Sequence, residues 1–307
     1  MDFGKVDEKE LDKIDFTLPP DPPDTEKILG ALKKKFTDAK KKKQKVYVGC
    51  AKWGRKEWLG KIYPLKTKEK DFVTHYVKQF NCIELNATHY RIPQPSSIEK
   101  WKADAAKEFK FCPKFPQMIS HMRRLKNCKR ETDEFIAAIH GFGVNLGTTF
   151  LQMPPNFTPK SIPELGSYLK ELPGDLEVSV ELRHPGWLNG TGEANVAFEM
   201  LRKLKAGSVI TDTAGRRDCC HMHLTNGTAF IRFVGNSLHP TDYTRIDDWV
   251  KRMKKWLKSG LEQLYFMMHM HDESDSPELI KYTIEQMNKH CKLDLKVPVF
   301  YNQGDLF

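Results

Sequence analysis

NCIELNATHY, residues 81–90, begins as a buried strand would begin and ends in polar side chains. Residues 82–85 combine apolar side chains with one acid, whereas residues 86–90 are mostly polar and typical of a loop. Strand-like runs of this kind recur eight times between residues 47 and 270, and most of them are followed by polar residues. Helical patterns separate most of the runs, so the sequence predicts parallel strands joined by crossover helices.

Eight such units predict an α/β fold of the TIM type, a (β/α)8 barrel with an N-terminal arm, and an open doubly wound sheet is the alternative. The expected strands are VYVGC (46–50), NCIEL (81–85), the run around 109–114, TTFLQ (148–152), VSVEL (178–182), GSVITD (207–212), TAFIRFVG (228–235) and LYFMMHM (264–270). CCHMHLTNG, residues 219–227, is a further strand-like segment that is expected to form half of a hairpin. Loops at the carboxyl ends of barrel strands build active sites, so the polar residues there predict an enzyme.

The chain is expected to divide into an arm, a barrel and a tail. Residues 1–45 form a Pro- and Lys-rich N-terminal arm, in which Asp24 is the expected cap of a helix that begins at Thr25. Residues 46–302 are long enough for one complete barrel. Residues 303–307 form the C-terminal tail.

The composition narrows the class of protein and of partner. A formal net charge of +10 and a lysine-rich stretch at residues 33–45 favour a polyanionic partner such as DNA or RNA, and solubility alone is the alternative explanation. No apolar run approaches the length of a membrane span, and the N-terminus lacks the apolar core of a secretory signal, so a cytoplasmic protein without a membrane partner is expected. Seven scattered cysteines without a Cys-x-x-Cys pair are expected to be reduced.

Three carboxylates at the ends of predicted strands are the candidates for catalysis: Glu84, Glu181 and Asp212. Carboxylates that converge at a barrel mouth can act as acid and base or bind a metal ion. The alternative is that they form ion pairs with nearby cations and only hold the mouth together. His121 is preferred over His89 as the acid–base histidine, since unperturbed imidazole titrates near neutral pH and arginines follow His121 in the chain.

Two histidine pairs are spaced so that both rings would share one face of a strand, namely His221 with His223 and His269 with His271. The second pair follows the eighth strand and precedes Asp272, and imidazole with carboxylate suits zinc or manganese. His269 and His271 are therefore the predicted ligands of a divalent metal, and a helix-capping loop is the alternative. No glycine-rich phosphate loop follows any predicted strand, so no nucleotide cofactor is expected.

Cationic, polar and aromatic residues at the same predicted mouth are the candidates for substrate binding. They are Lys52, Trp53, Asn86, Tyr90, Lys114, Gln152, Arg183, Trp187 and Arg232. Arginine forms bidentate contacts with phosphate, and aromatic rings beside cations stack on bases or sugars. An anionic substrate is therefore expected, and the alternative for each ring is that it closes the barrel rim.

QGDLF, residues 303–307, resembles the short peptides with which bacterial replication and repair proteins bind the sliding clamp. Gln303 stands first, and Leu306 and Phe307 stand last, as in those peptides. A Leu-Phe anchor can insert into an apolar pocket, so the tail predicts a sliding clamp as partner through Gln303 to Phe307. The alternative is that Leu306 and Phe307 pack against the barrel.

Seven ordered motifs run through the predicted barrel: VGCAKWGRKEWLGKIYP (48–64), FNCIELNATHYRIP (80–93), FKFCPKFPQMISH (109–121), TFLQMPPNF (149–157), VSVELRHPGW (178–187), VITDTAGR (209–216) and IRFVGN (231–236). Together they resemble the YecE-like family, domain-of-unknown-function family 72, over about residues 46–302. The resemblance implies a TIM-type barrel and a likeness to metal-dependent barrel endonucleases that cut damaged DNA. The chain departs from the family pattern at RFVG (232–235), where Arg-x-His-Gly is usual, and at HMHDE (269–273), where an Asn-rich ending is usual.

These patterns predict an enzyme that acts on a phosphate-bearing substrate, with nucleic acid and phosphodiester hydrolysis as the leading candidates. A sugar or sugar-phosphate enzyme is the first alternative, because paired carboxylates and stacking tryptophans suit carbohydrates equally well. A non-catalytic nucleic-acid or sliding-clamp binding protein is the second alternative.

Overall fold

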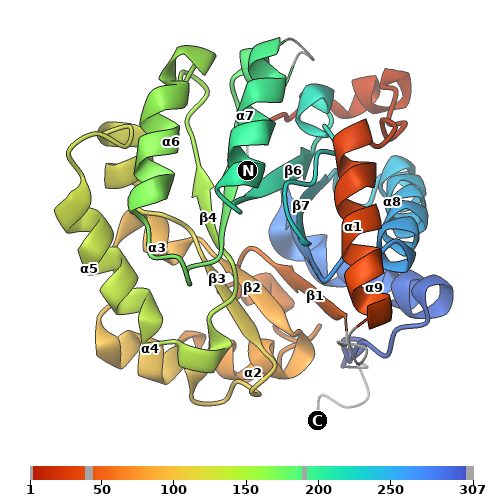
Figure 1. Cartoon of the computed structure of the whole chain (residues 1–307). Coiled ribbons are helices and arrows are strands. Elements are labelled where there is room, and N and C mark those ends of the chain that lie inside the picture. The colour runs from red at the N-terminus through yellow and green to blue at the C-terminus, as the bar shows by residue number, and fades with distance from the viewer. Residues whose placement is uncertain (1–2, 39–43, 189–191, 302–307) are drawn as a thin grey trace.

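The computed structural model describes residues 3–38, 44–188 and 192–301, and in these residues eight parallel strands form a nearly closed barrel (Figure 1). The strands are β1 (Lys45–Cys50), β2 (Cys82–Leu85), β3 (Lys110–Pro113), β4 (Thr149–Gln152), β5 (Val178–Glu181), β6 (Gly207–Asp212), β7 (Thr228–Gly235) and β8 (Gln263–Met270). Their order is β3, β2, β1, β8, β7, β6, β5, β4. The predicted TIM-type fold is therefore confirmed.

The barrel closes between β3 and β4, where continuous pairing is replaced by isolated contacts. The amide of Phe115 donates to the carbonyl of Phe150 at 3.0 Å, and the amide of Gly147 donates to the carbonyl of Phe111 at 2.8 Å. These bonds bring the residues that follow β3 beside β4, so the loops of both strands share one rim.

Helices surround the barrel because their apolar residues recur on one face. They are α1 (Pro23–Asp38), α2 (Phe72–Gln79), α3 (Ala87–Tyr90), α4 (Pro95–Lys102), α5 (Lys129–His140), α6 (Ile162–Glu171), α7 (Gly192–Lys203), α8 (Pro240–Lys258) and α9 (Ser276–Cys291). On α8 the buried side chains of Ile246, Trp249, Val250 and Met253 recur at intervals of three and four residues. This spacing gives the helix the apolar stripe that packs on the sheet.

Side chains alternate along each strand, and every second one points into the barrel. The buried inner cluster comprises Tyr47, Cys82, Cys112, Phe150, Val209, Phe230, Tyr265 and Met267. The residues two positions closer to the carboxyl ends are mostly polar and include Glu84, Lys114, Gln152, Thr211, Arg232 and His269. An apolar layer therefore fills the barrel, and a polar layer lies directly above it at the mouth.

The connection between β6 and β7 contains no α-helix, although all of its residues, 213–227, are described. The expected hairpin strand at 219–227 is wrong, since this segment has no strand pairing. Instead α1 lies outside this connection, between α7 and α8 (Figure 1), and the Thr25 hydroxyl donates to the carbonyl of Met222 at 3.0 Å. The helix of the arm thus takes the place of a crossover helix, and it begins at Pro23 rather than at Thr25.

Three expectations from composition and motifs have different outcomes. All seven cysteines are free thiols, as expected. Within the described residues no helix is long and apolar enough to cross a membrane. The tail at 303–307 lies outside the described residues, so sliding-clamp binding stays a prediction.

Candidate functional site

Glu84, Glu181 and Arg232 form a buried ion-pair triad at the barrel mouth. They come from β2, β5 and β7, and each side chain is at most 2% exposed. Arg232 donates from Nε to Glu84 Oε2 and from Nη2 to Glu84 Oε1, both at 2.8 Å, and from Nη1 to Glu181 Oε2 at 2.8 Å. The guanidinium therefore clamps two carboxylates from opposite parts of the barrel.

Further hydrogen bonds reach both carboxylates of the triad. Glu84 accepts from Asn86 Nδ2 at 2.9 Å and lies 2.9 Å from His269 Nε2. Glu181 accepts from Arg183 Nε at 2.7 Å and from Thr211 Oγ1 at 3.1 Å. Each oxygen of both carboxylates thus has a partner within the protein.

The pKa values of both triad carboxyls are depressed. Burial alone would raise the pKa of Glu84, but Arg232 and His269 outweigh it and hold the pKa well below its usual range. Burial likewise opposes ionisation of Glu181, and Arg183 with Arg232 lowers its pKa to about 2. Both groups are ionised at neutral pH and are poor proton acceptors, so they hold the site in shape rather than move protons.

Asp212 does not join the other two carboxylates. It follows Thr211, which points into the barrel, and its own side chain therefore lies on the outer side of β6. There it pairs with Arg245 at 3.0 Å, accepts from Trp249 Nε1 at 2.7 Å and contacts Arg217. The expected convergence of three carboxylates is wrong for Asp212, which attaches α8 and the loop after β6 to the barrel.

Lys114 lies at the mouth as the inward residue that follows β3. Its ammonium is 5.9 Å from the centre of the Phe150 ring and makes no hydrogen bond within the described residues. Burial lowers its pKa, Arg232 adds to this effect, and the result is a pKa of about 8. Lys114 therefore exchanges its proton far more readily at neutral pH than an ordinary lysine does.

Arg183 is the second cation at the mouth with unused donor capacity. Its Nε is bound to Glu181, but Nη2 is buried and has no hydrogen-bond partner in the part of the chain that the structure describes. A buried donor left unpaired costs about 1–3 kcal/mol, more when it is charged, so this nitrogen marks a place for an acceptor.

Two histidines stand beside the cations. The rings of His89 and His121 are 5.0 Å apart, and burial together with Lys114 lowers the pKa of each to about 4. The Nδ1 of His121 is 2.8 Å from the hydroxyl of Ser120. Both rings are neutral at pH 7, so each retains a nitrogen that can accept a proton.

The loop that carries His121 has an unusual backbone. His121 lies in a π-helical turn, Met118–Met122, and Arg124, Leu125 and Asn127 follow it with φ values of 48°, 69° and 49°. Such conformations cost energy in residues other than glycine, and they concentrate at functional sites. The loop is thus held in one shape beside the cations.

The other predicted substrate-binding residues lie in different surroundings. Gln152 is buried in the polar layer, whereas Lys52 is exposed. Trp53 is half-buried and packs against Tyr76 and Trp101 at the edge of the core. Tyr90 is 74% exposed beside His89 and is free to contact a ligand.

Trp187 is fully buried and donates from Nε1 to the carbonyl of Phe157 at 2.6 Å. We therefore expect Trp187→Phe to lower the free energy of unfolding by about 1–3 kcal/mol, because the carbonyl loses its donor. The affinity for inorganic phosphate should not change. Urea denaturation measures the stability, and calorimetric titration measures phosphate binding. If Trp187→Phe bound phosphate more weakly at unchanged stability, the predicted role of Trp187 in substrate binding would stand.

The predicted metal ligands do not form a metal site with their neighbours. His269 is paired with Glu84, and His271 is two residues further along, in the loop after β8. Among the described residues, no group of three or more His, Cys, Asp or Glu side chains is arranged to hold a metal ion. The described side chains around His269 and His271 therefore do not fit a divalent metal ion.

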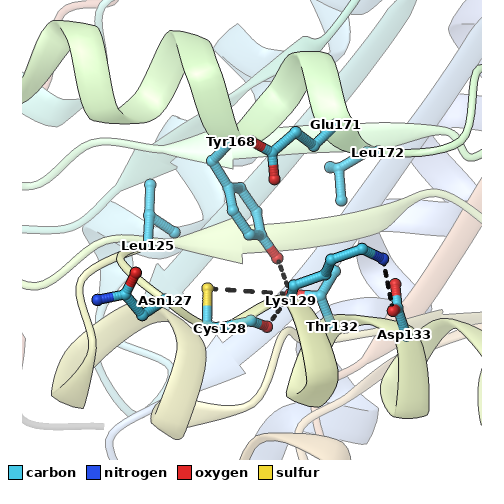
Figure 2. A pocket seen from close by; sticks show the side chains of 9 residues that line it. All are labelled: Leu125, Asn127, Cys128, Lys129, Thr132, Asp133, Tyr168, Glu171 and Leu172. Atoms are coloured by element: carbon cyan, nitrogen blue, oxygen red, sulfur yellow. Dashed lines mark hydrogen bonds and ion pairs between the residues drawn. The ribbon is translucent and has the colours of Figure 1, made fainter.

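One hollow of the described residues lies away from this chemistry. It has a volume of about 520 Å³ and lies between α5 and α6, outside the barrel (Figure 2). Its buried polar groups satisfy one another, since the Thr132 hydroxyl lies 3.0 Å from the Tyr168 hydroxyl and donates to the carbonyl of Cys128 at 2.8 Å. The barrel mouth, with its unused cationic donors, is the better candidate site.

Comparison with known families identifies the barrel. The family model described as "Protein of unknown function DUF72" matches residues 47–299. The chain belongs to the DUF72 family. YecE of Escherichia coli K12 and YecE of E. coli O157:H7 are each 28% identical to it over 280 residues, which cover 85% of this chain and 100% of YecE. YunF of Bacillus subtilis is 28% identical over 153 residues, 47% of this chain and 52% of YunF.

Solved structures of DUF72 proteins have the same fold. The crystal structure of a family member from Enterococcus faecalis V583 has a TM-score of 0.63 at 15% identity and covers 84% of this chain and 98% of its own. A member from Thermotoga maritima MSB8 has a TM-score of 0.61 at 22% identity and covers 81% and 100%. These similarities establish the DUF72 barrel, and the site of this chain must be judged from its own residues.

Proposed function

We propose that this DUF72 barrel is an enzyme that binds a phosphate-bearing substrate through Lys114 and Arg183. The observation that carries the proposal is the pair of buried cations with unused donors, Lys114 Nζ and Arg183 Nη2, within the described residues. Phosphate oxygens form short, charge-assisted hydrogen bonds with such donors. Arg232 is not free for this role, since its three nitrogens are already bound to Glu84 and Glu181.

The charge balance of the mouth supports an anionic ligand. The two ionised carboxylates, Glu84 and Glu181, are matched by the guanidinium groups of Arg232 and Arg183. Lys114 remains as an additional buried cation. A buried charge without a counterion is costly, so an anion from the substrate would complete the balance.

Proton transfer in this proposal belongs to His121 and Lys114. In the hydrolysis of a phosphodiester, water would attack phosphorus, His121 would accept the proton of that water, and the P–O ester bond would break. Lys114 would donate a proton to the leaving alkoxide, and the proton that His121 accepted would then return to the Lys114 amine. Lys114 and Arg183 would stabilise the charge on the phosphoryl oxygens as it redistributes.

DNA and RNA are the polymeric substrates of this class, and the net charge of +10 supports them. Turnover of phosphate monoesters and diesters, measured beside oligonucleotide binding at several salt concentrations, tests the proposal. Polymer binding should weaken steeply with salt, whereas a small substrate should show a shallow dependence. Oligonucleotide binding without any turnover would contradict an enzyme and favour a non-catalytic nucleic-acid binder.

Arg183→Met is expected to reduce the affinity for inorganic phosphate about 10- to 100-fold at pH 7, because one charge-assisted contact is lost. Calorimetric titration measures this change. Arg130→Met is the matched control, since the Arg130 side chain is 80% exposed on α5, and it should bind phosphate as the unmodified chain does. Equal affinity of both variants would contradict the role of Arg183.

A further inference from the structure

The start of the N-terminal arm lies on the candidate site. The ring of Phe3 stacks on the guanidinium of Arg183, with 3.9 Å between the ring centre and Cζ, and Arg216 lies 5.3 Å from the same ring. One face of the guanidinium that is proposed to bind phosphate is therefore covered by an aromatic ring of the N-terminal arm.

Backbone contacts fix this part of the arm to the loop after β6. The amide of Gly215 donates to the carbonyl of Gly4 at 2.8 Å, and the Thr213 hydroxyl lies 3.2 Å from the carbonyls of both Phe3 and Gly4. Gly4 has a φ of 71°, and a Cβ atom there would come within 2.4 Å of Thr213. Only glycine fits this position without displacement, so the contact is closely fitted.

A second anchor holds the arm further along. The ring centre of Phe16 lies 4.7 Å from Arg245 Cζ and 5.1 Å from Arg217 Cζ, and Arg217 Nη2 donates to the carbonyl of Phe16 at 3.2 Å. Asp21 then accepts from Arg252 at 2.8 Å and from Lys255 at 2.7 Å. The arm thus has anchors at the mouth, on the loop after β6 and on α8.

The contacts that fix the described part of the arm lie on one side of the mouth. Its contacts are with the loops that follow β5, β6 and β7 and with α8, as the pairs of Arg183, Gly215 and His239 show. On the other side, Tyr90 is 74% exposed and Met122 is 62% exposed. The loops that follow β2 and β3 therefore present exposed side chains beside the mouth.

The cover lies outside the region that the family model matches. The DUF72 model begins at residue 47, after the arm, and the matched relatives from E. coli are covered in full by 85% of this chain. The barrel closes through its own strands, whereas the contact with Arg183 comes from outside the matched region.

We infer that residues 3–16 form a cover over the phosphate site and that Phe3 is a specificity-determining residue that restricts the site to small phosphate-bearing molecules. This inference rests on the proposed function and narrows its substrate class. An extended nucleic-acid chain that places a phosphate on Arg183 needs the space on both sides of the guanidinium, and Phe3 occupies one of them. A small phosphate ester does not need the space that Phe3 occupies, and its binding to Lys114 and to Nη2, which is buried in this structure, requires only a movement of side chains at the mouth.

Two probes test the inference on the full-length chain: inorganic phosphate and a single-stranded thymidine octanucleotide with a 5′-phosphate. The unmodified chain should bind phosphate and should bind the octanucleotide weakly. Phe3→Ala should increase octanucleotide affinity by about tenfold or more, since it removes the stack on Arg183, and should change phosphate affinity less than about threefold. Calorimetric titration measures phosphate, and fluorescence anisotropy at one fixed salt concentration measures the octanucleotide.

Two variants control the experiment. Phe3→Trp keeps an aromatic cover and should behave as the unmodified chain does. Phe300→Ala removes a different aromatic–cation contact, that of Phe300 with Lys281 at 5.2 Å, and should leave both affinities unchanged.

A double variant extends the test. Phe3→Ala combined with Thr213→Val also removes the hydroxyl contacts and should admit the octanucleotide at least as well as Phe3→Ala.

The outcomes separate this inference from the proposed function. If all of the proteins bind phosphate, and the unmodified chain binds the octanucleotide as tightly as Phe3→Ala and the double variant do, Phe3 is not a cover. That result would overturn the inference and would not affect the phosphate site. Tight octanucleotide binding by the unmodified chain would overturn the size restriction and favour a nucleic-acid substrate. Absence of phosphate binding in every protein would overturn the proposed function, and the cover with it.

Discussion

Arg232→Met should lower the free energy of unfolding by about 3–5 kcal/mol at pH 7, because it leaves two buried carboxylates without their shared counterion. Arg232 is 1% exposed, and its three nitrogens hold Glu84 and Glu181 at 2.8 Å. Methionine fills part of the space but neutralises neither charge. Urea denaturation of the purified proteins measures the difference.

The effect of Arg232→Met should depend on pH. In the unmodified chain the folded-state pKa values of Glu84 and Glu181 lie below their unfolded values. The two ionised carboxylates therefore stabilise the fold above about pH 4.5, the ordinary pKa of glutamate. This contribution is lost as the pH falls towards the folded pKa, which is about 2 for Glu181. Without Arg232, burial raises the folded-state pKa values of both carboxyls above their unfolded values. Ionisation of Glu84 and Glu181 then destabilises the fold instead of stabilising it. The stability difference should therefore be largest near pH 7 and shrink as the carboxyls protonate.

A triple variant tests why Arg232→Met is expected to lose stability. Glu84→Gln and Glu181→Gln, added to Arg232→Met, remove the stranded charges and should recover a large part of the lost stability. A triple variant that is no more stable than Arg232→Met would show that packing, and not charge, accounts for the effect.

Lys114→Met should reduce the turnover of a phosphate ester by about 10²- to 10⁴-fold, since it removes both a cation at the phosphate and a group that exchanges protons. The substitution removes a buried charge, so the variant should fold at least as stably as the unmodified chain. Lys110→Met is the matched control, because Lys110 is a partly buried lysine at the opposite end of β3. Full turnover by Lys114→Met would contradict the mechanism.

The pH profile gives a separate test of Lys114. Its pKa of about 8 means that the charged form is lost as the pH rises through that value, and phosphate binding to the free protein should weaken over the same range. Arginine in place of Lys114 stays charged and should abolish this weakening. Binding to the unmodified chain that stays constant from pH 7 to pH 9 would contradict the role.

Periodicity explains which parts of the site could be predicted from the sequence. Strand runs placed Glu84, Glu181 and Arg232 correctly at the mouth, because residues at strand ends in a barrel must converge there. The same two-residue alternation, counted from Val209, puts Thr211 inside and Asp212 outside, so the local sequence does carry the signal that separates Asp212 from the mouth. The match of carboxylate to guanidinium depends on which strands lie opposite each other, which local sequence does not encode.

Residues outside the strands were harder to predict. Trp187 directly follows Pro185 and Gly186, which are typical of a loop, and only the fold shows that Phe157 and its neighbours bury it. Phe3 lies in an arm without periodicity, and its contact with Arg183 depends on the path of the whole arm. Such contacts depend on tertiary packing and leave no local pattern.

The replacement of a crossover helix by α1 has a consequence for the order of folding. A ribosome releases α1 first, yet the hydroxyl of Thr25 finds its acceptor at Met222, 197 positions later in synthesis. The apolar face of α1 must therefore wait until the second half of the barrel emerges, and the chain cannot complete its fold vectorially from the N-terminus. Contacts of such long sequence separation slow folding and leave a half-made chain open to aggregation.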